Sequence, residues 1–326
     1  MRMILGIHQL KVPLPMAGLP YVLPYLVQDG DENLLIDCGW NDPESYRALS
    51  GQLEELGTPI NEVRQLALTH VHPDHYGLAG RVKQESGATV VMHERERTLI
   101  VSRYRDPLDL LQEMDGYLHK NGVPEDEVAA MRDSSLPFLR HVVASEPDTT
   151  LQGGEHLQVG RFVLEALWTP GHSPGHLCFY EPNHKLLLTG DHILPTITPN
   201  VSLHPQQTGN PLSDYLASLK KLYDLPVDRV LPAHEFDVKH LRRRIDEILH
   251  HHDERLGEME EAVGPDGTTA YQVARTIRWA TGAFDSFNHW MQRAALAETL
   301  AHLVYLVSRD RLRESERDGR RVFWRP

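Results

Sequence analysis

Residues 69–75 of this 326-residue chain run Thr69-His70-Val71-His72-Pro73-Asp74-His75, with three histidines and an aspartate within six positions. The apolar residues Leu66–Leu68 just before them predict a buried strand, and Pro73 helps to end it. The ligand-type side chains therefore follow the carboxyl end of a strand, where α/β folds place their sites. His70 and His72 are two residues apart, so an extended chain presents both on one face.

The donor atoms of this stretch indicate which metals it could bind. Neutral imidazole nitrogen and carboxylate oxygen suit zinc, iron or manganese. No cysteine lies in the stretch, which argues against copper(I) and iron–sulfur centres. The stretch predicts a metal site.

Three further stretches share this arrangement: each stands at the end of a β-rich run and has glycine or proline before a histidine or aspartate. They are Thr169-Pro170-Gly171-His172-Ser173-Pro174-Gly175-His176, Thr189-Gly190-Asp191 and Leu231-Pro232-Ala233-His234-Glu235. One histidine of this kind is an ordinary core or surface residue. Four strand ends with the same arrangement indicate one shared site.

The remaining pattern predicts two sheets with helices around them. Short β-runs cover 7–12, 21–27 and 33–38, and a helix follows with Asp42 as N-cap and Pro43 at its first position. A second sheet is expected from four runs between 156 and 189. Helices are predicted at 211–223 and over most of the chain from 239 onward, which ends in a hairpin over 313–324.

These motifs, in this order, resemble those of the metallo-β-lactamase-fold metallo-hydrolase superfamily over about residues 5–237. The resemblance implies an α/β (α+β) fold, an αββα sandwich of two mixed β-sheets flanked by helices. It places a catalytic domain at 1–238, with a helical insertion at about 94–144 over the site. Residues 239–326 resemble the helical, winged-helix-like extension of the endoribonuclease-like branch.

The resemblance also assigns roles to individual residues. Two divalent metal ions are implied, zinc first and iron or manganese as alternatives. One metal would be held by His70, His72 and His172, the other by Asp74, His75 and His234, and Asp191 would bridge them. The ions would lower the pKa of a bound water, so that hydroxide acts as nucleophile. Asp74 would also be catalytic, orienting the hydroxide and passing its proton to the leaving group.

Several nearby residues are expected to support this site or to stand apart from it. His176 is predicted to be structural or to support a ligand, and His192 to point away or to meet substrate. Glu235 is expected to orient His234, and Asp37 to support the metal loop. The run His250–His252 is predicted to be solvated.

The motifs favour hydrolysis of a small ester, thioester or lactone, as in glyoxalase II thioesterases and acyl-homoserine lactonases. The main alternative is a metal-dependent phosphodiesterase or endoribonuclease. Lower alternatives are β-lactamase-type amide hydrolysis, a mononuclear iron persulfide dioxygenase, and a non-catalytic, metal-bearing regulator that binds nucleic acid. The expected partner is a small substrate molecule, and a net positive metal site would also accept an anionic one.

Charge and composition bound the partners. Residues 1–238 carry 18 basic against 32 acidic residues, whereas 239–326 carry 15 against 14. The acidic part repels polyanions. Seven arginines against four acids from Tyr305 onward keep nucleic acid as an alternative partner, beside a packing or homodimer role for this segment.

Cysteine content and hydropathy suggest the compartment. The two cysteines, Cys38 and Cys178, form no disulfide framework, and Cys38 is expected to be a small buried residue. Residues 1–18 make a poor secretory signal, and no uncharged apolar run approaches the roughly 18 residues that span a bilayer. We expect a soluble, cytoplasmic protein without membrane contact.

Overall fold

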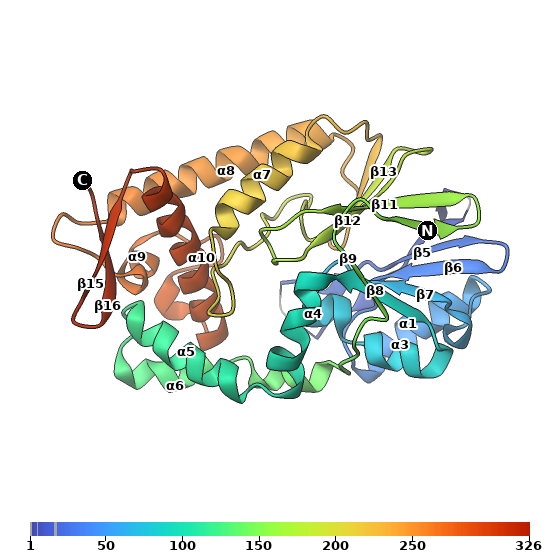
Figure 1. Cartoon of the computed structure of the whole chain (residues 1–326), viewed down its shortest axis with the longest axis horizontal. Helices are drawn as coiled ribbons and strands as arrows, with labels where there is room; N and C mark the ends of the chain where they lie inside the picture. The colour runs from blue at the N-terminus through green and yellow to red at the C-terminus, as the bar shows by residue number, and fades with distance from the viewer. Residues whose placement is uncertain (1, 5, 16–17) are drawn as a thin grey trace. The chain divides into compact units, whose positions relative to one another are not determined.

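Apolar strands pair into two mixed sheets in the computed structural model, which describes residues 2–4, 6–15 and 18–326 (Figure 1). The first sheet has the order β1 (Arg2–Ile4), β2 (Ile7–Gln9), β5 (Tyr25–Asp29), β6 (Glu32–Ile36), β7 (Gln65–Ala67), β8 (Thr89–His93) and β9 (Thr149–Leu151). The second has the order β10 (His156–Val159), β11 (Phe162–Trp168), β12 (Leu177–Glu181), β13 (Leu186–Gly190) and β14 (Arg229–Pro232). Short pairs are formed by β3 (Val12–Pro13) with β4 (Tyr21–Val22) and by β15 (Arg313–Arg317) with β16 (Arg320–Trp324).

Helices account for much of the remaining chain. They are α1 (Pro43–Glu55), α2 (Pro73–Tyr76), α3 (Ala79–Ser86), α4 (Glu94–Ile100), α5 (Leu108–Lys120), α6 (Glu125–Asp133), α7 (Pro211–Leu222), α8 (Leu241–Ala262), α9 (Ala270–Thr276) and α10 (His289–Ser308). Asp42 caps α1 as predicted, since its side chain accepts hydrogen bonds from the amides of Glu44 and Ser45. Within the described residues, none of the helices combines the length and the apolar character that crossing a membrane requires.

The first sheet is buried on both faces. Along β6, Leu34 and Ile36 point into a core shared with the second sheet, where they meet residues such as Phe162 and Leu164. Leu35 points the other way, into a core with Leu49 of α1. This alternation follows from the two-residue period of a strand, and it gives the layers seen in Figure 1, with α1 and α3 outside the first sheet. The predicted fold class, an αββα sandwich, is confirmed.

Strand direction gathers the motifs at one edge. β6, β7 and β8 run parallel to one another, and β13 runs parallel to β14. Their carboxyl ends therefore lead into the loops that carry Asp37, residues 69–75, Asp191 and His234. This is why segments far apart in sequence meet around one site.

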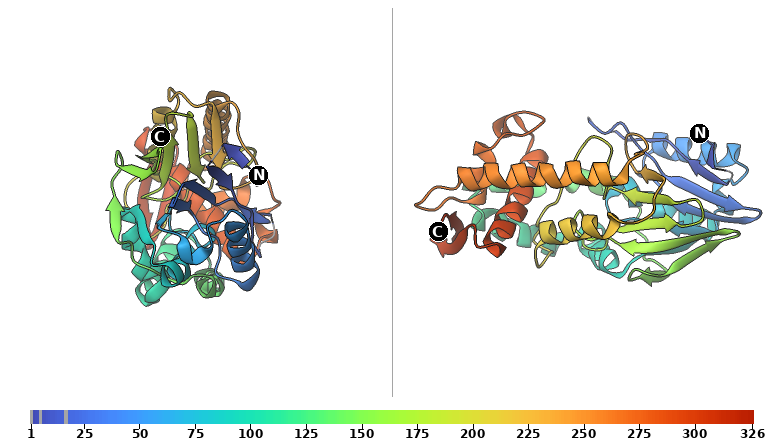
Figure 2. Two further views of the ribbon diagram at one scale, coloured as in Figure 1. Left: turned by 90° about the vertical axis from the view of Figure 1, so that its right-hand side faces the viewer. Right: turned by 90° about the horizontal axis from the view of Figure 1, so that it is seen from above.

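Contacts divide the chain into two compact units. The first comprises Met1–Arg105, Phe138–Pro199 and Ser218–Ile245, and the second Asp106–Pro137, Asn200–Ala217 and Asp246–Pro326. The division falls within α7 and α8, and α8 is one unbroken helix (Figure 2). The predicted insertion is helical, and the predicted terminal hairpin is β15–β16. The domain roles, with a boundary at 238 and a winged-helix-like end, stay predictions.

Candidate metal centre

Three histidine nitrogens converge after β7 and β11, and we call His70, His72 and His172 the histidine cluster. His70 Nε2 lies 2.9 Å from His72 Nδ1, and His172 Nε2 lies 3.2 and 3.1 Å from these two atoms. Three nitrogens bound to one zinc ion are spaced roughly 3.3 Å apart, given Zn–N bonds of about 2.0–2.1 Å in tetrahedral geometry. The spacing therefore suits a shared metal ion.

Hydrogen bonds select the nitrogen that His70 offers. The Thr69 hydroxyl donates to the Asp37 carboxylate, with Oγ1 2.9 Å from Oδ2, because a carboxylate can only accept. Thr69 Oγ1 is also 2.9 Å from His70 Nδ1 and must accept from that ring nitrogen. The Nδ1 proton leaves Nε2 as the atom with a lone pair, the tautomer that a ligand needs.

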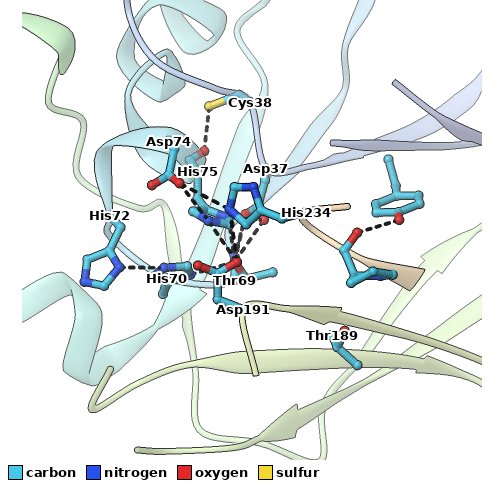
Figure 3. Close-up of polar contacts among 12 residues, drawn as sticks. Asp37, Cys38, Thr69, His70, His72, Asp74, His75, Thr189, Asp191 and His234 are labelled. Carbon is cyan, nitrogen blue, oxygen red and sulfur yellow. Dashed lines mark hydrogen bonds and ion pairs between the residues drawn. The ribbon is translucent and has the colours of Figure 1, made fainter. Parts of the chain in front are cut away.

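Four side chains form a second group, and we call Asp74, His75, Asp191 and His234 the mixed cluster (Figure 3). His234 Nε2 lies 3.3 Å from both Asp74 Oδ2 and Asp191 Oδ1, and His75 Nε2 lies 3.4 Å from Asp191 Oδ1. The ring of His75 donates from Nδ1 to Asp37 Oδ2 at 2.8 Å, and that of His234 donates from Nδ1 to the Tyr21 carbonyl at 3.0 Å. Both rings thus turn Nε2 toward the carboxylates.

The carboxylate of Asp191 lies between the two clusters. Its Oδ1 faces His75 and His234, and its Oδ2 is 3.6 Å from His172 Nε2. Gly190 makes this turn possible, because it has φ +49° and an added Cβ would lie 2.8 Å from His176 Nε2. The Gly-Asp motif therefore has a steric basis as well as a chemical one.

The two clusters differ in how burial and charge change their pKa values. Burial lowers the pKa of His70 and His72 well below the usual value, and neighbouring imidazoles add to the effect. Burial also lowers the pKa of His75 and His234, but Asp191 and Asp74 outweigh it, so the pKa of both histidines rises. Burial would raise the pKa of Asp74, yet the neighbouring histidines bring it to about 2.

Unsatisfied polar atoms test whether these residues fit a metal. Within the described part of the chain, His75 Nε2, Asp191 Oδ1 and His234 Nε2 are buried and accept or donate no hydrogen bond. Such atoms are costly unless another partner satisfies them. All three face one another, and their donor chemistry is that of a divalent metal site. The residues fit the implied metals.

The expected supporting residues have mixed outcomes. Asp37 does support the loop, since it accepts hydrogen bonds from Thr69 and His75. His176 contacts a ligand rather than joining a cluster, because its Nε2 accepts from the Asp191 amide at 3.2 Å. The prediction for Glu235 was wrong: its carboxylate accepts from the Thr196 amide at 2.8 Å, and Nδ1 of His234 donates to the Tyr21 carbonyl instead.

His192, His252 and Cys38 are all buried. His192 is fully buried, with its ring 5.7 Å from that of His176, so it offers no surface to substrate. The run His250–His252 was predicted to be solvated, but His252 is buried against His302 because it lies on the inner face of α8. Cys38 is buried as expected, and its thiol donates to the carbonyl of His75 at 3.1 Å.

One buried residue was missed. Glu96 carries no motif signal, yet its carboxylate accepts hydrogen bonds from Val71, Ser173 and Gly175, in the loops of the histidine cluster. Only the spacing of a glutamate just after the strand 88–92 could have drawn attention to it. Its contacts are 25 to 79 positions away in sequence.

Comparisons with known proteins identify the family of this chain. The family model of the metallo-beta-lactamase superfamily matches residues 17–234. The Bacillus subtilis (strain 168) protein named "Probable metallo-hydrolase YqjP" is 27% identical over 322 residues, which cover 97% of this chain and 96% of that protein. The chain belongs to the metallo-beta-lactamase superfamily, and the predicted enzyme class, a metallo-hydrolase of that superfamily, is confirmed.

Solved structures support the same assignment. The crystal structure of a metallo-beta-lactamase family protein from Thermus thermophilus has a TM-score of 0.83 and 31% identity, with 99% of each chain covered. A beta-lactamase domain protein from Burkholderia ambifaria has a TM-score of 0.78 at 24% identity, covering 100% of this chain and 94% of that one. The second similarity concerns the fold alone.

Proposed function

We propose that this chain is a dinuclear metal-dependent hydrolase that cleaves a small ester, thioester or lactone. The observation that carries the proposal is the carboxylate of Asp191, which faces the mixed cluster with one oxygen and His172 with the other. Two ligand sets that share one carboxylate suit two metal ions held close together. Zinc is the first choice for this donor set, with iron or manganese as alternatives.

The site residues divide the remaining tasks. When bound, two divalent ions supply a water of lowered pKa as nucleophile and polarise the carbonyl under attack. Oδ2 of Asp74 faces Nε2 of His75 and Nε2 of His234. We assign to this carboxylate the task of holding a proton and delivering it to the leaving oxygen or sulfur. Asp37 fixes the ring of His75, and Thr69 fixes that of His70, so both rings keep the ligand tautomer.

Charge supports a small substrate over a polyanion. The two carboxylates of the clusters would face four positive charges from two divalent ions, so the loaded site stays positive and can attract a small anion. The whole chain has a formal net charge of −13, which disfavours long-range attraction of RNA or DNA. A phosphodiesterase or endoribonuclease activity is therefore an outcome to be tested beside the main proposal.

The other proposals concern organisation. We assign catalysis to residues 1–238 and a winged-helix-like, packing or dimerisation role to 239–326, where α9, α10 and the β15–β16 hairpin lie. A cytoplasmic location is supported by Cys38 and Cys178, which are both unpaired thiols. Size-exclusion chromatography with light scattering would measure the oligomeric state.

The decisive experiment joins metal content to substrate choice. Purified protein is analysed for metal and tested on thioesters, lactones, β-lactams, aryl phosphodiesters and short RNA. We expect near two metal equivalents per chain and hydrolysis of an ester, thioester or lactone. Asp74→Asn should lower the turnover by about 100-fold or more. Wild-type turnover in that variant would contradict the proton transfer assigned to Asp74.

A further inference from the structure

Glu96 is a buried carboxylate that belongs to neither cluster. It lies in the first turn of α4, directly after β8, and its side chain is inaccessible to solvent. Burying a carboxylate is costly unless hydrogen bonds compensate it. Glu96 receives such bonds from two separate loops, and these loops carry every ligand of the histidine cluster.

The first of these loops is held at the peptide groups on either side of Val71. The Val71 amide donates to Glu96 Oε2 at 2.8 Å, and the Val71 carbonyl accepts from the Tyr104 hydroxyl at 2.7 Å. Val71 is the residue between His70 and His72. The segment from α4 to the helical turn Val101–Arg105 therefore holds the backbone that spaces two ligands.

The second loop meets the other carboxylate oxygen. Glu96 Oε1 accepts from the Ser173 hydroxyl at 2.8 Å and from the Gly175 amide at 2.7 Å. Gly175 is pressed against the start of α4, since an added Cβ would lie 2.8 Å from His93 Nδ1 and 2.9 Å from Glu96 Cγ. Ser173 directly follows His172, so this contact sets the position of the third ligand.

We propose that Glu96 is a positioning residue that joins the two loops and so preassembles the histidine cluster for its metal. The inference rests on the proposed function only in that the cluster binds a metal ion. The histidine cluster has no carboxylate of its own, so its affinity depends on nitrogens held in place before the metal arrives. Loss of Glu96 would leave the ligands present but free to separate.

The test compares metal affinity in full-length variants. Metal-depleted protein is titrated with Co²⁺, and binding is followed by calorimetry and by visible absorption. In Glu96→Gln the amide NH₂ cannot accept, so at least one of the loop contacts is lost. We expect one equivalent to bind about 10–100-fold more weakly, while the other changes little. The exposed Glu94→Gln on the same helix turn is the matched control and should behave as wild type.

A double-variant cycle separates positioning from general destabilisation. Glu96→Gln should add nothing to the loss of affinity caused by His72→Ala, because both act on the same metal, whereas independent structural damage adds. Additive losses, or two equivalents that bind Glu96→Gln as they bind wild type, overturn the proposal. Circular dichroism and thermal unfolding confirm that each variant is folded.

If Glu96→Gln does not fold, two variants that each remove a single hydroxyl group test the same proposal. Tyr104→Phe removes only the hydroxyl that bonds the Val71 carbonyl, and Ser173→Ala removes only the hydroxyl that bonds Glu96. Each should weaken the same equivalent severalfold, and unchanged affinity in both would overturn the proposal. The readout of this test is metal binding, not hydrolysis. A wild type that binds two metals but hydrolyses nothing in the substrate panel would therefore refute the proposed function and leave the role of Glu96 unaffected.

Discussion

The histidine cluster holds three imidazoles and no carboxylate, whereas the mixed cluster combines two carboxylates with His75 and His234. Burial keeps the pKa of His70 and His72 low, while Asp191 and Asp74 raise that of His75 and His234. The two carboxylates of the mixed cluster can bind a cation by charge once it displaces the protons that they help His75 and His234 to hold. The histidine cluster must rely on neutral lone pairs in a fixed arrangement.

The two clusters also differ in the carboxylate outside the ligand set that holds them in place, Asp37 for the mixed cluster and Glu96 for the histidine cluster. Asp37 bonds a ligand ring of the mixed cluster directly, at His75 Nδ1, and also accepts from the Thr69 hydroxyl beside it. Glu96 accepts its hydrogen bonds from the loops beside the ligands, at Val71, Ser173 and Gly175. Ring support tunes one donor atom, whereas loop support sets the distance between donors.

The largest effect is expected where the clusters meet. Asp191→Asn removes the carboxylate that faces both clusters, and we expect hydrolysis to fall by about 1,000-fold or more, since both metals would lose their shared ligand. Metal analysis should show less than two equivalents per chain. Asp228→Asn, an exposed residue before β14, is the control. Wild-type metal content and turnover in Asp191→Asn would contradict the role of Asp191 as a ligand shared by the two clusters.

The next effect concerns ring support. Asp37→Asn keeps a side chain that tolerates φ +60° but removes the charge that faces His75. Metal affinity should fall about 10–100-fold at one equivalent, measured by competition with a chromogenic chelator. The exposed Asp31→Asn serves as control. An unchanged affinity would show that the hydrogen bond to His75 Nδ1 does not tune the ligand.

Buried histidines away from both clusters show what burial does without carboxylates close by. In the second unit, His252 Nδ1 of α8 lies 3.0 Å from His302 Nε2 of α10, and the ring of Tyr215 packs against His252. Burial lowers the pKa of His302 to about 4 and that of His252 well below its usual value, and Arg255 and His251 add to the effect. Both rings are neutral in the folded chain at pH 7.

This pair predicts a loss of stability in acid. An unfolded histidine has a pKa near 6.5, so the unfolded state takes up protons between about pH 6.5 and 4 while folded His302 does not. Stability is therefore present above pH 6.5 and lost as the pH falls, by about 2 kcal/mol between pH 7 and 5 for His302 alone.

Urea unfolding of the chain in a chelator, followed by tryptophan fluorescence, measures this change. In His302→Gln the loss of stability between pH 7 and 5 should be smaller than in wild type, by up to about 2 kcal/mol, while buried His70 and His72 still contribute to the remaining slope. His250→Gln, at a side chain that is mostly exposed, should keep the wild-type profile. A His302→Gln curve that runs parallel to the wild-type curve from pH 7 to 5 would contradict the assignment.

The smallest effect is expected at Glu235, the carboxylate beside His234 that does not bond it. Because Glu235 accepts from Thr196 instead, Glu235→Gln should leave metal affinity within about twofold of wild type. The chelator competition used for Asp37→Asn makes the two results directly comparable. If Glu235→Gln lost as much metal affinity as Asp37→Asn, Glu235 would support His234 without a hydrogen bond to it, and the contrast with Asp37 would be wrong.

The metal centre could be predicted from sequence because its signals are local. Each ligand follows an apolar strand, and a glycine or proline lies within the same short stretch, as is usual where strands end. Parallel strands then bring those ends to one edge, so the residues of both clusters meet as expected. Asp37 was within reach for the same reason, since it directly follows β6.

Other features depended on contacts that no local pattern records. Glu96 bonds partners up to 79 positions away, and its spacing from the strand is that of any helix-starting glutamate. His252 is buried and His250 exposed, because only the packing of α8 against α10 decides which side of a histidine run turns inward. Glu235 bonds Thr196, and His234 bonds the Tyr21 carbonyl, partners that the local sequence does not reveal.

Side-chain chemistry and the order of the strand ends were therefore enough to indicate which residues can bind metal and which family they resemble. Tertiary structure decided how those residues are held: which nitrogen of His70 carries the lone pair, which oxygen of Asp191 faces each cluster, and which buried carboxylate joins the loops. Ligand type is a property of single residues. Ligand geometry depends on hydrogen bonds between segments that only the folded chain brings together.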